Sequence, residues 1–270
     1  MPAQGREDLH LDARIMQLLR TVNGLLRADR AVRAASPTGL MHGSAGLRAR
    51  HYAVLPLSER SGLIRWVEGV TPLYSLYEAR LSHAAAQAAP REGGRPQAAS
   101  PPETPRPADT FYAKLTPALH KAGVPAGAPR RAWPHGVLRS VLLELMRETP
   151  RDLIAHELWG RAANAAAGWA ASRAYAASAA TNSMVGYVVG LGDRHLDNVL
   201  LDLSSGELLH IDYNVCFEKG LRLKVAETVP FRMTPAMVSA LGPWGVDGPL
   251  CRPALLPTGY SGVVTRALWP

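Results

Sequence analysis

The sequence predicts an α+β protein in which short strand pairs accompany a mostly helical larger part. Three observations indicate this fold class. Residues 8–26 carry apolar side chains at helical spacing, residues 52–67 contain two short strand-like runs, and residues 199–212 have the pattern of a β-hairpin. From residue 111 to residue 189 the apolar side chains recur with helical periodicity. We therefore expect helices to outnumber strands.

The composition is that of a protein with a sizeable buried core. The chain has 270 residues, of which 47% are hydrophobic, enough for one large core or two small ones. The sequence has no run of about 18 apolar residues and no signal-peptide pattern, so we expect a soluble, intracellular protein. Its two cysteines, Cys216 and Cys251, are far apart and have no metal-ligand partners at useful spacing, which argues against a disulfide framework.

The chain is basic, with a formal net charge of +8. Its Lys and Arg residues are scattered rather than gathered in runs with interleaved aromatic residues, which is the pattern of a nucleic-acid surface. We therefore expect no direct binding to nucleic acid and attribute the charge to solvated faces.

The first predicted helix covers residues 8–26, with Asp8 as its expected N-cap. Asp12 would lie near the helix start, where the macrodipole favours acidic side chains, and that placement alone would explain it as structural. Residues 27–49 show no period and are interpreted as a connection. The two strands that follow are predicted at residues 52–57 and 62–67, with a turn at residues 58–61.

The middle of the chain is predicted to be helical on either side of an insert. Residues 82–109 are rich in Ala, Pro and Arg and are predicted to be disordered, because such a segment cannot bury a core. Helical spacing returns near Phe111 and continues through residues 137–146 and 153–158. Ala163 to Val189 is predicted to form one long buried helix that ends at Gly190 and Gly192.

The candidate chemistry lies directly after this helix, where Asp193 and Asn198 stand five residues apart. The hairpin that follows has its turn at residues 204–206, where Gly206 can take a positive φ. Its return strand brings Asp212 back towards Asn198, so that both could hold one ion. Two acids and an amide in this arrangement are what phosphoryl transfer from Mg-ATP requires. The alternative for an Asp-Arg-His triplet alone is an ordinary Asp/Asn-rich surface loop, and the hairpin argues against it.

At these residues the chain resembles the phosphatidylinositol-3-kinase-related protein kinases. The run Gly192-Asp193-Arg194-His195-x-x-Asn198 followed by His210-Ile211-Asp212 is similar to their catalytic and metal-binding loops. Ordinary protein kinases write the catalytic triplet in the reverse order, as His-Arg-Asp. Three further strings resemble the same family, at residues 7–17, 52–67 and 229–234, and the resemblance covers about residues 5–248. Within the family, residues 210–220 look most like the branch that acts in nonsense-mediated mRNA decay.

The resemblance implies a bilobal protein or lipid kinase-like fold with an incomplete small lobe and a mostly helical large lobe. Residues 1–67 would form the partial small lobe, and residues 68–248 the large lobe with the insert at 82–109. Residues 249–270 would be a divergent tail. Gln4 stands where the family has its phosphate-binding Lys, and the family's Gly-rich loop is not found before it. We therefore expect this chain by itself to be weakly active or inactive.

The resemblance also implies the roles of the site residues. Asp193 would accept or orient the proton of the substrate hydroxyl, and His195 would stabilise charge on the transferring phosphoryl group. Asn198 and Asp212 would hold Mg²⁺ (or Mn²⁺). The expected ATP pocket is formed by Asp12, Tyr52, Trp66, Val67, Leu200 and Ile211. Trp66 would lie against the adenine, the main chain of Val67 would hydrogen-bond its edge, and Arg194 would fix the loop rather than take part in the chemistry.

The function implied by the resemblance is that of an ATP-dependent serine/threonine protein kinase. It would phosphorylate Ser or Thr followed by Gln, with the helicase of mRNA decay as its protein substrate, in the cytoplasm and nucleus and without a membrane. Two alternatives stay open. One is a catalytically incomplete kinase-like fragment that acts as a binding module. The other is a lipid kinase, which is less favoured because Lys219, Arg222 and Lys224 make only a weak basic cluster after Asp212.

Overall fold

The structure, a computed structural model, describes residues 3–5, 8–30, 46–88, 105–223, 225–229, 231–243 and 245–247. For residues 3–5, 88 and 247 it describes only the main chain. The chain forms two compact units: residues 1–76 together with 152–270, and residues 77–151. The first unit contains every described residue of the predicted site.

A small antiparallel sheet begins the first unit. It consists of β1 (Ala3–Gly5), β2 (Val54–Ser58) and β3 (Ser61–Ile64), in the order β1-β3-β2. The predicted strand pair is confirmed, with Leu55 opposite Leu63, but its strands are shorter than predicted. The register shifts between Pro56 and Ser58, where proline has no N–H to give to a ladder. The strand β1, which pairs with β3, was not predicted.

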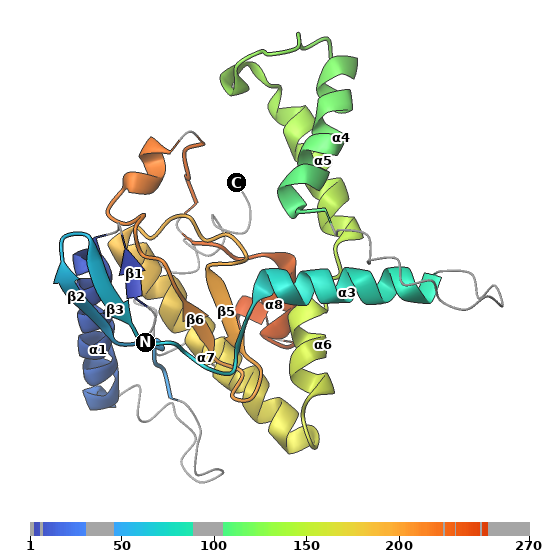
Figure 1. The fold of residues 1–270 in the computed structure, drawn as a ribbon. Helices are drawn as coiled ribbons and strands as arrows, with labels where there is room; N and C mark the ends of the chain where they lie inside the picture. Colours follow the sequence, from blue (N-terminus) through green and yellow to red (C-terminus); the bar gives the residue numbers. More distant parts are fainter. Residues whose placement is uncertain are drawn as a thin grey trace, which may run out of the picture. The chain divides into compact units, whose positions relative to one another are not determined.

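Helix α1 (His10–Ala28) contacts β2 (Figure 1). Its buried side includes Ile15, Met16 and Leu19 at helical spacing, as predicted. The prediction of Asp8 as N-cap is wrong, because Leu9 is the N-cap residue and its side chain is buried. Asp8 lies one residue before this cap, and its carboxylate accepts a hydrogen bond from the main-chain N–H of His10 at 2.9 Å.

Helix α7 (Ala165–Val189) confirms the prediction of one long buried helix. Asn164 caps its first turn by accepting from the N–H of Ala167 at 2.9 Å. Gly190 ends it in the left-handed conformation with φ 57°, which glycine adopts without a Cβ penalty. Small side chains let this helix lie close to β6, where the Ser178 hydroxyl accepts from the N–H of Leu208 at 2.9 Å.

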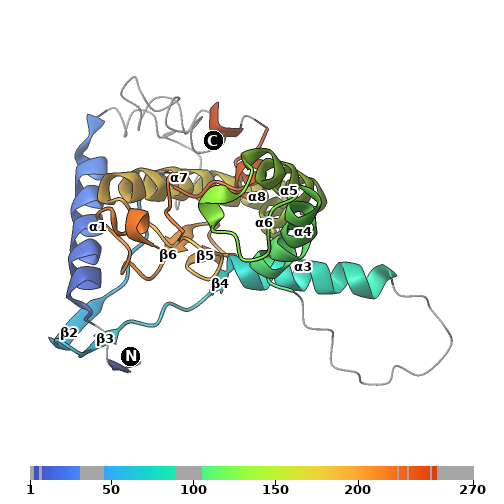
Figure 2. The same ribbon diagram turned by 90° about the horizontal axis from the view of Figure 1, so that it is seen from above.

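A second antiparallel sheet holds the predicted hairpin. Its strands are β4 (Val70–Pro72), β5 (Val199–Asp202) and β6 (Leu208–His210), in the order β4-β5-β6, and Val199 pairs with His210. Gly206 has φ 83° in the turn, and a Cβ there would collide with the main chain of Ala171, so glycine is required. Figures 1 and 2 show the hairpin lying over α7.

The main core of the first unit joins α1, the end of α7 and the hairpin. It therefore places the first helix, the loop after α7 and the end of β6 around one set of packed side chains. Its buried members are Ile15, Met16, Leu19, Ala49, Tyr52, Val185, Val189, Leu191, Leu200, Leu209, Tyr213 and Cys216.

Two further α-helices and two short 3-10 helices complete this unit. They are α6 (Leu153–Gly160), η2 (Lys219–Arg222), α8 (Pro235–Ala240) and η3 (Gly245–Asp247). Thr234 is the N-cap of α8, and the buried hydroxyl of Tyr175 on α7 donates to the carbonyl of Met237 at 3.1 Å. This contact fixes the end of the segment that follows Asp212 against the long helix.

The second unit consists of helices. Helix α3 (Leu73–Ala88) begins in the first unit and continues into the second, which also contains α4 (Pro107–Lys121), η1 (Arg130–Ala132) and α5 (His135–Glu148). Helices α4 and α5 pack through Leu115, Leu119 and Val141. None of the helices in the described ranges is both long and apolar enough to cross a membrane.

The predicted disordered insert needs a correction at both ends. Residues 82–88 belong to α3 and residues 107–109 to α4, so the helices extend further than composition indicated. Ala residues favour helix, and Pro107 is compatible with the first turn of a helix, where its missing N–H is not needed. The rest of the insert up to residue 104, and the predicted tail at 249–270, lie outside the described residues. The predicted division between lobes at residue 67 stays a prediction.

Candidate active site

The loop after α7 is closed by hydrogen bonds between its own two ends. Asn198 donates from Nδ2 to the main-chain carbonyl of Asp193 at 2.9 Å, and its N–H donates to the carbonyl of His195 at 3.0 Å. Asp193 has φ 54°, a left-handed conformation that costs a residue with a side chain about 1–2 kcal/mol. The loop therefore holds Asp193 in a conformation that must be stabilised by its surroundings.

The hairpin returns Asp212 to this loop, as predicted. The N–H of Ile211 donates to the carbonyl of Asn198 at 3.1 Å. Asp212 is the next residue along the chain, so this contact holds it near Asn198. Asp212 also has a left-handed main chain, with φ 57°, and its Oδ1 accepts from the N–H of Asn214 at 3.2 Å. Its side chain is exposed.

Arg194 ties these two loops together. It is 6% exposed, and its guanidinium lies over the ring of Tyr213 at 5.7 Å from the centroid. Burial lowers the pKa of Arg194. Its donors contact four main-chain carbonyls, those of Gly192 at 2.9 Å, Asn198 at 3.4 Å, Ile211 at 2.7 Å and Asp212. The prediction that Arg194 fixes the loop is confirmed.

His195 lies at the open side of the loop, with its side chain 50% exposed. Its Nδ1 accepts from the N–H of Asp197 at 3.2 Å and lies 3.5 Å from Oδ2 of the same residue. When Nδ1 accepts this hydrogen bond, the proton of the neutral ring is on Nε2. Nε2–H is then a donor available to an oxygen of a bound phosphoryl group.

Asn198 and Asp212 fit the predicted Mg²⁺ site in their donor atoms. Nδ2 of Asn198 is used in the bond to Asp193, which leaves Oδ1 as its ligand atom, and Oδ1 of Asp212 already accepts from Asn214. Oxygens of an amide and a carboxylate are suitable ligands for Mg²⁺, which takes its other ligands from phosphate and water. In the described ranges, no three or more His, Cys, Asp or Glu side chains gather as a metal site.

Asp12 and Tyr52 lie against the back of this site. Asp12 is 5% exposed, and its Oδ1 accepts from the N–H of Tyr213 at 3.2 Å. Tyr52 is buried, and its N–H contacts the sulfur of Met16 at 3.4 Å. Burial, together with the negative charge of Asp12, raises the pKa of Tyr52, so its phenol stays protonated.

The other predicted adenine-pocket residues divide into two groups. Leu200 is a buried member of the main core, and Val67 and Ile211 pack partly buried against that core. Trp66 is 71% exposed, so its indole is a surface group here. Gln4 pairs with Gly62 through the main chain of β1, but its side chain and all of Glu7 lie outside the described residues.

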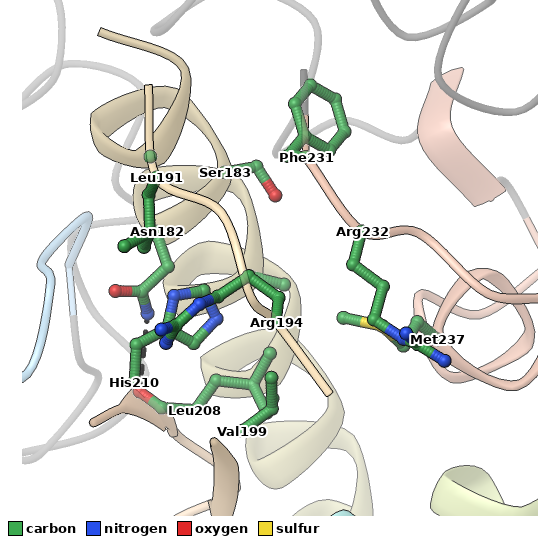
Figure 3. Close-up of a pocket in the computed structure, with 12 residues that line it drawn as sticks. Asn182, Ser183, Leu191, Arg194, Val199, Leu208, His210, Phe231, Arg232 and Met237 are labelled. Atoms are coloured by element: carbon green, nitrogen blue, oxygen red, sulfur yellow. Dashed lines mark hydrogen bonds between the residues drawn. The ribbon is translucent and has the colours of Figure 1, made fainter. Parts of the chain in front are cut away.

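A small pocket lies beside the loop after α7 and is lined by residues of α7, the hairpin and residues 231–237 (Figure 3). Arg194 and His210 both line it, and Asn182 from α7 donates to the carbonyl of Leu208 at 3.3 Å. Burial, and secondly the charge of Arg194, lower the pKa of His210 to about 3. His210 is therefore a neutral structural residue at neutral pH.

The sequence prediction missed one residue that contacts the loop directly. Both carboxylate oxygens of Glu227 accept from the main-chain N–H of Asp193, at 3.0 and 2.9 Å. Glu227 is a single acid in an irregular segment, and neither periodicity nor spacing marks it.

An Asp-Asn loop and an Asp just beyond a strand end, gathered by a buried Arg, are the arrangement expected of an ATP-dependent phosphotransferase. Comparison with known proteins agrees. The sequence pattern of the family described as phosphatidylinositol 3- and 4-kinase matches residues 3–253. The chain belongs to this family.

Curated relatives that match the chain include serine/threonine protein kinases. Serine/threonine-protein kinase SMG1 of Danio rerio is 48% identical over 246 residues, which are 91% of this chain and 6% of that protein. Serine/threonine-protein kinase Smg1 of Drosophila melanogaster is 48% identical over 249 residues, which are 91% of this chain and 7% of that protein. The chain thus spans a small part of the length of these relatives.

Solved structures agree with the fold. The FAT and kinase domain of CtTel1 superposes with a TM-score of 0.68 at 25% identity, covering 92% of this chain and 15% of that one. The complete CtTel1 dimer gives the same TM-score, with 98% of this chain and 9% of that one covered. The predicted kinase-like α+β fold and the predicted membership of the phosphatidylinositol-3-kinase-related kinases are confirmed.

Proposed function

We propose that this chain carries the phosphoryl-transfer site of a serine/threonine protein kinase, which uses ATP with Mg²⁺ or Mn²⁺. The observation that carries the proposal is the contact set of Arg194. Its guanidinium donates to the carbonyl of Gly192, directly before Asp193, and to the carbonyls of Asn198, Ile211 and Asp212. A fixed spacing of these groups is what catalysis of phosphoryl transfer requires, because the protein contributes positioning and electrostatics.

Each side chain then has a role that follows from its contacts. The Asp193 carboxylate orients the substrate hydroxyl and takes its proton, while Nε2–H of His195 donates to an oxygen of the transferring phosphoryl group. Oδ1 of Asn198 and a carboxylate oxygen of Asp212 hold the metal ion. A bound Mg²⁺ would supply positive charge to neutralise the charge that develops on the phosphate. Asp12, Tyr52, Val67, Leu200 and Ile211 supply the inner wall of the nucleotide pocket, and Trp66 its outer face.

The finer part of the proposal concerns the substrate. The 48% identity to the SMG1 kinases supports a protein substrate and a role in nonsense-mediated mRNA decay. We propose Ser/Thr-Gln sites on the decay helicase as the acceptors. We further propose that the chain acts in the cytoplasm and nucleus, which imaging of the tagged chain would test.

The test is transfer of labelled γ-phosphate from Mg-ATP to a Ser-Gln peptide by the purified chain. Asp193→Asn should abolish transfer, whereas Asp109→Asn, which alters an exposed acid in the first turn of α4, should leave it unchanged. A matched Ser-Ala peptide should be a much poorer acceptor, and phosphoinositide vesicles should accept nothing. Transfer to the vesicles in place of the peptide would contradict the proposal and favour a lipid kinase.

Absence of transfer has a defined meaning as well. We expect this chain by itself to turn over slowly, because Gln4 stands in place of the phosphate-binding Lys. Mg-ATP binding that depends on Asp212, without transfer, would therefore favour the alternative of a kinase-like binding module. Absence of both binding and transfer from a folded chain would overturn the proposal.

A further inference from the structure

The segment after Asp212 is mostly exposed but returns to the catalytic loop. Described residues 213–229 contain the short helix η2, and Phe217 and Glu218 before it both have positive φ, 53° and 64°. Two main-chain bonds hold the first part of the segment. Gly192 donates to the carbonyl of Val215 at 2.8 Å, and Phe217 donates to the carbonyl of Val189 at 2.7 Å.

Glu227 makes a third connection, from the far part of the segment. Its two carboxylate oxygens accept from the N–H of Asp193 at 3.0 and 2.9 Å. A hydrogen bond to an ionised carboxylate is roughly twice as strong as one between neutral groups. The hydrogen bond from Asp193 to Glu227 holds a residue whose left-handed main chain, with φ 54°, is intrinsically unfavourable. Glu227 at the N–H of Asp193 and Asn198 at its carbonyl therefore hold the main chain of Asp193 in place.

The position of Glu227 is itself fixed by the fold. Its N–H donates to the carbonyl of Gly220 at 3.0 Å, which closes the segment on η2. Its carboxylate lies against Gly192, where a Cβ would collide with Oε2 and would come within 2.9 Å of Val215 Cγ1. The missing side chain at Gly192 thus makes room for the carboxylate beside Asp193.

We propose that Glu227 is a positioning residue that couples the fold of the segment after Asp212 to the placement of Asp193. The Asp193 carboxylate is correctly oriented only while the segment is folded back with Glu227 on the Asp193 N–H. A substrate or partner that displaces this segment therefore acts on Asp193 through Glu227. The structural part of this inference stands on the contacts alone, and its kinetic part rests on the proposed function.

The experiment compares three substitutions in the full chain with one control. Glu227→Ala removes the acceptor, Glu227→Gln keeps the shape but not the charge, and Glu227→Asp shortens the side chain by one methylene. Glu218→Gln is the control, because Glu218 is an exposed acid in the same segment. Amide hydrogen exchange at Asp193, followed by NMR, reports the contact directly and requires no turnover.

We expect exchange at Asp193 to accelerate by about tenfold or more in Glu227→Ala and Glu227→Asp, by less in Glu227→Gln, and not at all in Glu218→Gln. Amides in the middle of α7 should exchange at the wild-type rate, which separates a local effect from general loss of stability. In the kinase assay, kcat should fall by about 10- to 100-fold in Glu227→Ala. KM for ATP should change by less than about twofold, because the hydrogen bonds of Glu227 within the described residues go to Asp193 and Gly220, which are not nucleotide-pocket residues.

Each failure has a distinct meaning. Unchanged exchange at Asp193 in Glu227→Ala, or in Glu227→Gln and Glu227→Asp should the alanine variant not fold, overturns the structural part. Accelerated exchange with full kcat overturns the kinetic part. A wild-type chain that transfers no phosphate contradicts the proposed function and with it the kinetic part, and the exchange measurement still decides the structural one.

Discussion

The main-chain N–H of Tyr213 donates to Oδ1 of Asp12 at 3.2 Å, joining residues that are 201 positions apart in the sequence. Asp12 is in the first turn of α1, and Tyr213 directly follows the candidate metal ligand Asp212. Both residues are buried, at 5% and 2% exposed. The bond therefore fastens the loop that would hold the metal ion to the helix that would border the nucleotide pocket.

Replacing Asp12 should test this connection. Asp12→Ala leaves the buried N–H of Tyr213 without its acceptor, which should lower the free energy of unfolding by about 1–3 kcal/mol. Asp12→Asn keeps Oδ1 as the acceptor, so its free energy of unfolding should fall clearly less than that of Asp12→Ala. Urea denaturation of the two variants and the wild type measures the difference. Equal stability of the alanine variant and the wild type would show that the bond contributes nothing.

Arg194 should tolerate no substitution by Lys. A lysine ammonium is compact and cannot reach the four carbonyls that the planar guanidinium contacts together. Arg194→Lys should therefore reduce the free energy of unfolding by about 2–4 kcal/mol and lower Mg-ATP affinity. The control is Arg161→Lys, in which an exposed arginine paired with Glu157 is changed and stability should move by less than about 0.5 kcal/mol. Similar losses in both variants would contradict the special role of Arg194.

Acid should weaken the hairpin through Asp202. Burial alone would raise the pKa of the Asp202 carboxyl. Hydrogen bonds from Ser204 and Arg50 outweigh this effect and lower the pKa below 3.8. A folded-state pKa below the unfolded one means that the unfolded chain binds the proton more readily. The stability from Asp202 is therefore complete above pH 3.8 and is lost as the pH falls through the lower folded value.

The variant Asp202→Asn isolates this contribution. At pH 6 it should be less stable than the wild type, and the gap should narrow as the pH is lowered to about 3. Thermal unfolding across this pH range measures the gap. A gap that stays constant with pH would mean that the charge of Asp202 is not what stabilises the turn.

Local patterns predicted much of this fold because short-range physics decides those parts. The long helix α7 follows from its long stretch of mostly small and apolar residues, and Gly190 ends it in a conformation that favours glycine. The hairpin follows from two apolar runs and Gly206, whose turn no other residue fits. Because the hairpin fixes the return of the chain, the approach of Asp212 to Asn198 could also be predicted.

Long-range polar contacts could not be predicted in this way. Glu207 is 2% exposed and pairs with Arg48 at 2.5 Å, although nothing in either local sequence distinguishes it from a surface acid. The hydrogen bond that Glu227 accepts from the N–H of Asp193 is also a long-range polar contact, here between an irregular segment and a loop. Strand β1 was missed because three residues are too few for a period, and β3 supplies the pairing that makes them a strand.

Trp66 offers the sharpest test of the nucleotide site, because its indole is 71% exposed and contributes little to the core. Trp66→Ala should leave the free energy of unfolding within about 0.5 kcal/mol of the wild type. If the indole stacks on adenine, the same variant should bind Mg-ATP about tenfold more weakly, since stacking of a base on an aromatic ring contributes about 1–3 kcal/mol.

The matched control for Trp66 is Trp169→Ala, which removes another half-exposed indole, 49% exposed on α7. Titration of both variants with a fluorescent ATP analogue gives the two affinities, and Trp66→Phe should recover most of the loss because a phenyl ring also stacks. A loss that is equal at the two positions would indicate a nonspecific effect of removing tryptophan. Unchanged affinity in Trp66→Ala would place the adenine elsewhere, and the outer face of the pocket would then have to come from another residue.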